Sequence, residues 1–130
     1  MKPNIKNIED IKLLVDSFYN KVKKDSIIGY IFNEVIEVNW ENHLPKMYRF
    51  WETILFNKAS FKGNPMLKHI LINTKERLKQ EHFDRWVVLW NETINENFTG
   101  SIAEQAKQRG QSIGQLMHYK IRESEKINEG

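Results

Sequence analysis

Four histidines supply the side chains of this sequence that are best suited to bind a metal or to move a proton. His43 and His69 lie in segments rich in apolar and aromatic residues, whereas His82 stands among charged residues and His118 lies near the C-terminal end. There is no cysteine, so disulfides, thiolate metal sites and cysteine nucleophiles are excluded. A zinc site needs three or four converging ligands, and no two of these histidines have a His-x-x-x-His spacing. We therefore take His43 and His69 as candidate functional residues and expect His82 to lie on the surface.

Two interpretations of His43 and His69 stay open at this level. A single histidine on a half-apolar helix is commonly structural, with its ring nitrogens bonded to neighbouring groups. The same two residues also suit a flat apolar cofactor, because haem iron takes an axial histidine nitrogen and the porphyrin needs apolar walls. His69 fits this second interpretation, since it lies in "GNPMLKHIL", residues 63–71, between a turn signal and an apolar run. We expect no Gly-x-Ser-x-Gly nucleophile elbow, no P-loop and no dinucleotide fingerprint, so hydrolase and nucleotide chemistry find no support.

Composition narrows the class of protein. The chain has 130 residues, of which 40% are hydrophobic and 12% aromatic, and this fits one domain over 1–130 with a real core. The net charge of +3 comes from basic residues interspersed with acids, without the dense basic stripe of a nucleic-acid surface. The start of the chain has no signal-peptide core, and no stretch approaches the ~20 apolar residues that cross a bilayer. We expect a cytoplasmic protein without nucleic-acid or membrane partners.

The elements that must position the histidines are predicted to be helices. Apolar residues recur at helical spacing and no alternating strand pattern is present, so the predicted fold class is all-α. The predicted helical segments cover residues 8–22, 25–33 (a short helix or two turns), 40–55, 66–71, 74–98 and 101–121, and 57–65 form a loop. Asn7 caps the first helix. Pro45 either places the start of its helix near Glu41 or kinks the helix.

The last predicted helix carries further local signals. Ser101 and Glu104 form a capping box at its start. Gly110 and Gly114 cost helix stability, so we expect them to allow close approach of a neighbour or a bulky ligand. The chain ends, 1–6 and 123–130, are predicted to fray.

Five segments carry the most distinctive residues, and they are "FYNKVKKD" (18–25), "GYIFN" (29–33), "WENHLPKMYRFW" (40–51), "FKGNPMLKH" (61–69) and "EHFDRWVVLW" (81–90). Their order and spacing resemble the third group of the bacterial truncated haemoglobins, over about Ile8 to Met117. Other groups carry a Gly-Gly pair after the distal helix, where this chain has "LFNKAS". Pro45 departs from the family pattern and could shift His43 into or out of the pocket.

The resemblance implies a two-over-two helical globin sandwich around one haem b, iron protoporphyrin IX. His69 matches the proximal iron ligand. Tyr19, Trp86 and His43 match the distal residues that stabilise a bound ligand. Further cofactor contacts are implied for Phe32, Met47, Phe50, Trp51 and Met66, and Lys46 and Lys68 are candidates to pair with the propionates.

Plainer roles remain open for the same residues. Tyr19 can be a buried phenol, Trp86 part of a core stripe, and Met47 a gap filler. Lys46 and Lys68 can be solvated. A haem-free all-α interaction module would use these aromatic stripes as core or as a partner groove, and it is the alternative to the haem hypothesis.

The family implies a five-coordinate ferrous iron that binds O2, NO and CO. Two hydrogen bonds to a charged ligand, at ~1.5 kcal/mol each, would slow its loss by ~100-fold. A pocket of this kind favours ligand retention or chemistry, such as NO detoxification or peroxide handling, over simple oxygen transport. A reductase is the expected electron donor, and the chain is expected to be a monomer or weak dimer.

Overall fold

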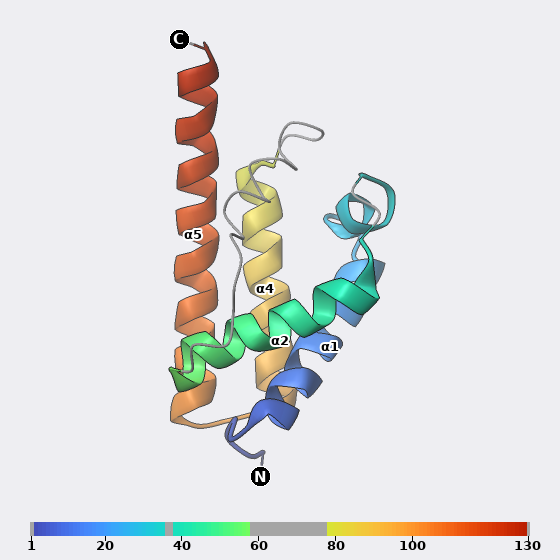
Figure 1. Cartoon of the computed structure of the whole chain (residues 1–130), viewed down its shortest axis with the longest axis vertical. Helices are drawn as coiled ribbons and strands as arrows, with labels where there is room; N and C mark the ends of the chain where they lie inside the picture. Colours follow the sequence, from blue (N-terminus) through green and yellow to red (C-terminus); the bar gives the residue numbers. More distant parts are fainter. Residues whose placement is uncertain (1, 36–37, 58–77, 130) are drawn as a thin grey trace.

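The computed structural model describes residues 2–35, 38–57 and 78–129 (Figure 1). Its elements are α1 (Ile8–Lys24), the π-helix η1 (Ile31–Val35), α2 (Trp40–Phe56), α4 (Gln80–Asn97) and α5 (Ser101–Glu129). The described part of the chain contains no strand, which confirms the all-α class. The predicted helix at 66–71 and nearly all of the predicted loop at 57–65 lie outside the described residues. Within them, no helix is long and apolar enough to cross a membrane.

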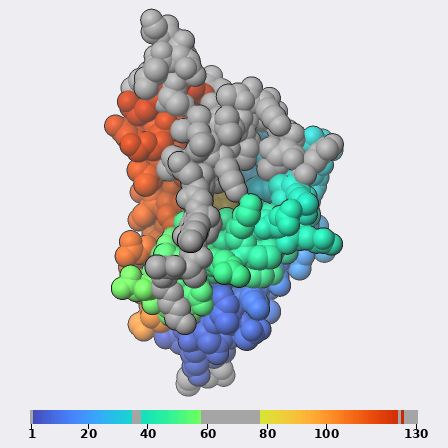
Figure 2. Space-filling model, viewed as in Figure 1, coloured from blue at the N-terminus to red at the C-terminus, as the bar shows by residue number. Residues whose placement is uncertain are grey.

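The helices form two pairs that cross each other. α4 and α5 lie antiparallel, joined by a short connection, and α1 packs against both α2 and α4 (Figure 1). The space-filling view shows α2 lying across α1 and meeting α5 at one edge of the same face (Figure 2). This is the predicted two-over-two arrangement, and it places the middle of α2 against both α1 and α4.

The first helix forms where the sequence predicts it. The Asn7 side chain accepts a hydrogen bond of 3.0 Å from the Asp10 N–H, which satisfies one of the open donors of the first turn. The buried face repeats at helical spacing, and its members are Ile11, Leu14, Val15, Phe18, Tyr19 and Val22. Because these side chains point inward together, α1 fixes the direction of Tyr19.

Pro45 lies inside α2 and does not end it. The helix begins at Trp40 and runs to Phe56, so Pro45 stands beyond the first turn, where its missing N–H removes one backbone hydrogen bond. Asn57 closes the helix in the left-handed conformation, with φ of 56°. The helix therefore starts one residue before Glu41 and continues through the proline.

The connection from α4 to α5 differs from the sequence prediction. Ser101 is the first helical residue of α5, one position after the N-cap position that the predicted capping box with Glu104 requires. The Ala103 N–H instead donates to the Asn4 side chain at 3.1 Å, and the Thr99 N–H donates to the Pro3 carbonyl at 2.8 Å. These two N–H groups at the start of α5 therefore have hydrogen-bond acceptors in a segment almost one hundred residues away in sequence.

The predicted fraying of the chain ends, 1–6 and 123–130, stays a prediction, and the structure describes residues 2–6 and the helical backbone over 123–129. Ile5 is only 1% exposed and belongs to the core, and its neighbours Pro3 and Asn4 hold the α4–α5 connection. At the other end, α5 continues as helix to Glu129. Residues 2–5 therefore act as part of the packed structure.

Gly110 and Gly114 allow the close approach that their spacing predicts. A Cβ built on Gly110 would lie 2.7 Å from Trp90 Nε1, and one on Gly114 would lie 3.2 Å from Val87 Cγ2. The neighbour is α4, whose Trp90 is fully buried and donates to the Ala106 carbonyl at 3.0 Å. Gly110 thus leaves room for the Trp90 indole, and Gly114 lets Val87 pack closely against α5.

Candidate functional site

Tyr19 lies at the centre of a group of rings between α1 and α2. Its ring centroid is 5.2 Å from that of His43, 5.3 Å from Trp40 and 6.1 Å from Phe32. We call these four residues the α1–α2 aromatic cluster. Burial raises the pKa of Tyr19, because the charged phenolate would lose its solvation. The Tyr19 hydroxyl therefore keeps its proton and remains a hydrogen-bond donor.

His43 joins this cluster from α2 in spite of the nearby proline. Its ring makes edge contacts with Tyr19 and with Trp40, whose centroid lies 5.7 Å away, and its Nε2 atom is buried. The continuous helix through Pro45 thus brings His43 onto Tyr19. The structure brings these two sequence-predicted site residues together.

Trp86 reaches the same region from α4 through Phe18. The Phe18 ring stands perpendicular to Trp86 at 5.6 Å and contacts Tyr19 at 4.9 Å. Trp86 is half-buried, and it lies parallel to Trp90 at 6.1 Å. The three residues predicted to donate to a ligand, Tyr19, Trp86 and His43, therefore come from three helices that meet around Phe18 and Tyr19.

Several of the other predicted cofactor contacts lie on α2. Met47 and Phe50 are half-buried and pack against the core, and Lys46 is exposed. Their roles toward a cofactor stay predictions. The proximal histidine and two more predicted contacts, His69, Met66 and Lys68, lie outside the described residues.

Two predicted contacts have aromatic partners in the protein itself. Trp51 is 3% exposed and stacks on Trp90, with centroids 4.4 Å apart and planes at 22°. Phe32 stacks on Trp40 at 6.1 Å, with planes at 25°. Their described contacts are thus with the helix interface and with the aromatic cluster, and a further contact with a cofactor stays a prediction.

Trp40 is a member of the cluster that was predicted only as part of an apolar stripe. It contacts Tyr19, His43 and Phe32, and the Lys23 ammonium lies 4.3 Å from its ring centroid. The signal in the sequence was the spacing of Trp40 and His43, one helical turn apart. Such spacing puts both side chains on one face of α2.

His82 corrects the surface assignment made from its charged neighbours. It is 7% exposed, and its Nδ1 accepts a hydrogen bond of 2.9 Å from the Lys79 N–H at the start of α4. Its Nε2 lies 3.3 Å from the Tyr30 hydroxyl. His82 thus fixes the start of α4 at Gln80, later than the predicted Thr74, and ties it to the segment before η1.

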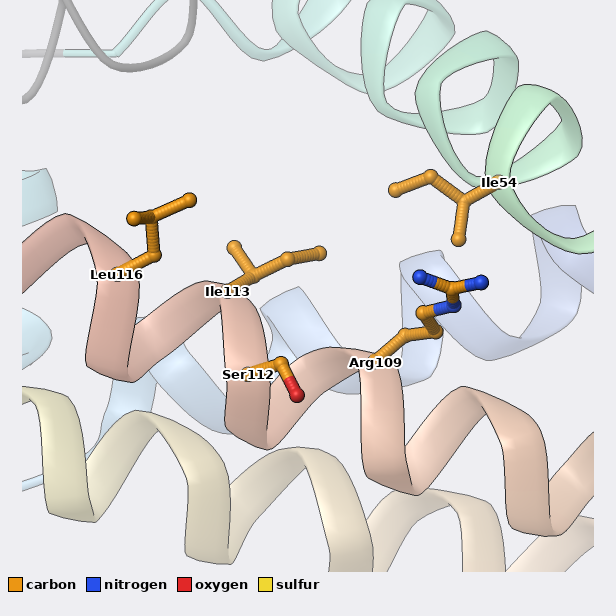
Figure 3. Close-up of a pocket in the computed structure, with 5 residues that line it drawn as sticks. All are labelled: Ile54, Arg109, Ser112, Ile113 and Leu116. Carbon is orange, nitrogen blue, oxygen red and sulfur yellow. The ribbon is translucent and has the colours of Figure 1, made fainter.

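The expectation that the sequence lacks a Gly-x-Ser-x-Gly motif was wrong. Residues 110–114, "GQSIG", match the Gly-x-Ser-x-Gly pattern of a nucleophile elbow, which requires a sharp turn between a strand and a helix. Here Ser112 lies within α5, where Arg109, Ser112, Ile113 and Leu116 face Ile54 across a shallow hollow (Figure 3). Among the described residues, neither a histidine nor a carboxylate lines this hollow, and the glycines serve the packing against α4, so the described surroundings of the motif show no hydrolase geometry.

Metal binding by clustered side chains also finds no candidate. Among the described residues, no group of three or more histidines, aspartates or glutamates lies close enough to hold an ion.

Comparison with known proteins identifies the family. No family model matches the chain. The group 3 truncated hemoglobin ctb of Campylobacter jejuni is 33% identical over 126 residues, which cover 92% of this chain and 97% of that protein. The crystal structure of the group III truncated hemoglobin from Campylobacter jejuni superposes with a TM-score of 0.80 and 30% identity, over 93% of this chain and 95% of that one. With near-complete coverage, shared helical architecture and this identity, the chain belongs to the group III truncated haemoglobins.

Proposed function

We propose that this protein binds one haem b and uses it to retain and transform diatomic ligands. The observation that carries the proposal is the contact of Tyr19 with His43, at 5.2 Å between ring centroids, in an otherwise aromatic cluster. A buried phenol beside a half-buried imidazole puts two polar groups into a largely apolar setting, where each favours a polar ligand. The family name adds support, since a haemoglobin is a haem protein.

The described residues fit such a group by their chemistry. Tyr19 offers a hydroxyl that keeps its proton, Trp86 offers an indole N–H, and Phe32 and Trp40 offer flat apolar surface. When bound, haem supplies an iron with an axial position that takes O2, NO or CO. His69 would hold the iron, on the strength of the sequence resemblance alone.

The proposed role of the distal residues is to donate hydrogen bonds to a ligand that carries negative charge. Tyr19 is buried and Trp86 half-buried, so each bond would form in surroundings with little competing water. Two such bonds at ~1.5 kcal/mol each would together slow ligand loss by ~100-fold. A protein that holds its ligand so tightly is better suited to consume it, by reaction with nitric oxide or by handling of peroxide, than to deliver it.

The test begins with the absorption spectrum of the protein expressed with a haem supplement. We expect a Soret band near about 400 nm, and its loss in His69→Ala. A folded chain that stays colourless would end the proposal and leave the haem-free helical module as the function.

Ligand kinetics then test the distal donors. We expect Tyr19→Phe and Trp86→Phe each to release O2 about tenfold faster, since each loses one bond of ~1.5 kcal/mol. Tyr119→Phe is the matched control, because Tyr119 is 58% exposed on α5. Unchanged release rates in both distal variants would remove the assigned roles of Tyr19 and Trp86.

Turnover requires an electron source, and we propose a separate reductase in the cytoplasm that serves a monomer or weak dimer of this chain. A nitric oxide consumption assay, with and without a reductase-containing extract, measures whether such a donor sustains repeated cycles. Consumption that stops after one equivalent in both samples would contradict it.

A further inference from the structure

Three tryptophan rings form a continuous stack through the core of the protein. Trp86 and Trp90 are parallel within 3° at 6.1 Å between centroids, and Trp90 and Trp51 lie at 22° and 4.4 Å. The stack joins α4 to α2 where these helices cross in Figure 1. Phe18 packs edge-on against both Trp86 and Trp90, at 5.6 and 5.0 Å.

The middle ring of this stack is held in one orientation. Trp90 is fully buried, its Nε1 donates to the Ala106 carbonyl at 3.0 Å, and Gly110 leaves the space that its indole fills. Trp51 is 3% exposed. Rings fixed in face-to-face contact and shielded from water exchange electrons readily, because little reorganisation accompanies each transfer.

A tyrosine with a proton acceptor lies one helical turn from the end of the stack. Tyr48 precedes Trp51 by three residues on α2, so the two side chains occupy neighbouring positions on the helix. The Tyr48 hydroxyl donates a hydrogen bond to the Asp16 carboxylate of α1. Burial, followed by this hydrogen bond to Asp16, raises the pKa of Tyr48 to about 12.

This pairing matters because a phenol gives up an electron most easily when its proton leaves at the same time. The Tyr48 proton is already directed at a carboxylate oxygen. The other end of the stack, Trp86, is half-buried and belongs to the proposed distal site. The three rings therefore connect a place where oxidants would react to a residue prepared for oxidation.

We propose that Trp86, Trp90 and Trp51 form an electron-transfer path that lets Tyr48 and Asp16 supply an electron to the distal site when hydrogen peroxide reacts there. The peroxide reaction rests on the proposed function. Reduction of one H2O2 to two H2O takes two electrons and two protons. The path delivers the two electrons one after the other, with Tyr48 restored in between by a one-electron reductant from solvent, and the two protons come from solvent.

Each step of the path conserves charge. Oxidised Trp86 takes an electron from Trp90, Trp90 takes one from Trp51, and Trp51 takes one from Tyr48. The phenolic proton passes to Asp16, which leaves a neutral tyrosyl radical and a neutral carboxylic acid. Tyr48 is half-buried, so a small one-electron reductant of the ascorbate class can restore it from solvent.

The path is tested first without any dependence on haem. Azide radicals from pulse radiolysis of the purified protein oxidise indole in preference to phenol, and the indolyl and tyrosyl radicals absorb at different visible wavelengths. We expect the indolyl band to decay as the tyrosyl band grows, at a rate independent of protein concentration.

Single substitutions assign this transfer to the proposed residues. We expect Tyr48→Phe to abolish the growth of the tyrosyl band, and Trp90→Phe and Trp51→Phe each to abolish it by interrupting the stack. Asp16→Asn, which keeps the stack and the phenol but removes the proton acceptor, should suppress it as well. Tyr119→Phe is the control and should leave it unchanged, with helix content by circular dichroism confirming the fold of each variant.

The outcomes separate this inference from the proposed function. Growth that persists in Tyr48→Phe, or that vanishes only in Tyr19→Phe, would overturn the path even in a protein that binds haem. In the haem-loaded protein mixed with peroxide, we expect an electron paramagnetic resonance signal that narrows on tyrosine deuteration and disappears in Tyr48→Phe. A colourless protein that still shows the transfer after radiolysis overturns haem binding and the peroxide role, and leaves the electron path standing.

Discussion

Replacement of Gly110 by alanine gives the sharpest test of the packing between α4 and α5. The new Cβ would lie 2.7 Å from Trp90 Nε1, closer than real Cβ atoms approach a neighbour, and the buried indole has little room to move. Alanine gains ~1 kcal/mol of helix propensity over glycine. Against this stand about 1–3 kcal/mol for overpacking and ~1 kcal/mol for the strained hydrogen bond from Trp90 to Ala106.

The sum predicts that Gly110→Ala lowers the free energy of unfolding by about 1–3 kcal/mol. Gly114→Ala is the matched control on the same helix, because its Cβ would lie 3.2 Å from the Val87 methyl group, which can yield by a few tenths of an ångström. We expect the control to stay within ~0.5 kcal/mol of the parent, since strain and propensity nearly cancel.

Urea unfolding, followed by circular dichroism, measures both variants, and the dependence of free energy on urea should keep its slope. If Gly110→Ala is as stable as Gly114→Ala, the close fit of Trp90 against α5 is refuted. Trp90 fluorescence provides an independent check, because a displaced indole loses its buried environment.

Two further predictions concern single hydrogen-bonded groups. Burial by itself would raise the pKa of Asp25, but the Arg85 guanidinium at 2.8 Å and two backbone N–H groups outweigh it and lower the pKa below 3.8. The stabilisation by ionised Asp25 is complete above pH 3.8 and is lost as the pH falls through the lowered pKa. The free energy of unfolding should therefore decline in acid, and Asp25→Asn should remove this part of the decline. An unaltered acid profile in this variant would contradict the role given to Asp25. Asn4→Ala should cost ~1 kcal/mol, because the Ala103 N–H loses its cap from a distant segment. Equal urea midpoints for Asn4→Ala and the parent would show that water replaces this bond at no cost.

Local sequence signals predicted the helices that are governed by their own residues. Asn7 caps α1 as expected, and the helical spacing of apolar residues identified the buried face that carries Tyr19. Gly110 and Gly114 indicated a close contact, although the sequence did not say that Trp90 makes it. The cap and the buried face of α1 depend on neighbours within a few turns, which are visible in the sequence, whereas the partner of Gly110 lies on another helix.

Features that depend on distant residues were not predictable in the same way. The Ser101–Glu104 capping box is a sound local motif, yet Asn4 supplies the cap because Ile5 is drawn into the core beside it. His82 has charged neighbours in sequence, but its position in the first turn of α4 turns its ring to the Lys79 N–H. The partner of each group was set by tertiary packing.

The candidate site also combines residues that the sequence identified with contacts that only the folded structure shows. Tyr19, His43 and Trp86 were named through the family resemblance, and the helix crossings then explain how α1, α2 and α4 bring them together around Phe18. Trp40 has no motif of its own, and only its contacts reveal its place in the cluster. Ring stacking across helices, as between Trp51 and Trp90, leaves no periodic trace in the sequence.

The bond from Ala103 to Asn4 has a consequence for the order in which the chain is built. Because the ribosome synthesises a chain from its N-terminal side, residues 2–5 cannot form these hydrogen bonds until residues 99–103 have been synthesised. Closing so long a loop carries a large entropic cost, so docking of this arm belongs among the last folding events. The segment before α1 thereby holds the start of a helix that is synthesised almost one hundred residues after it.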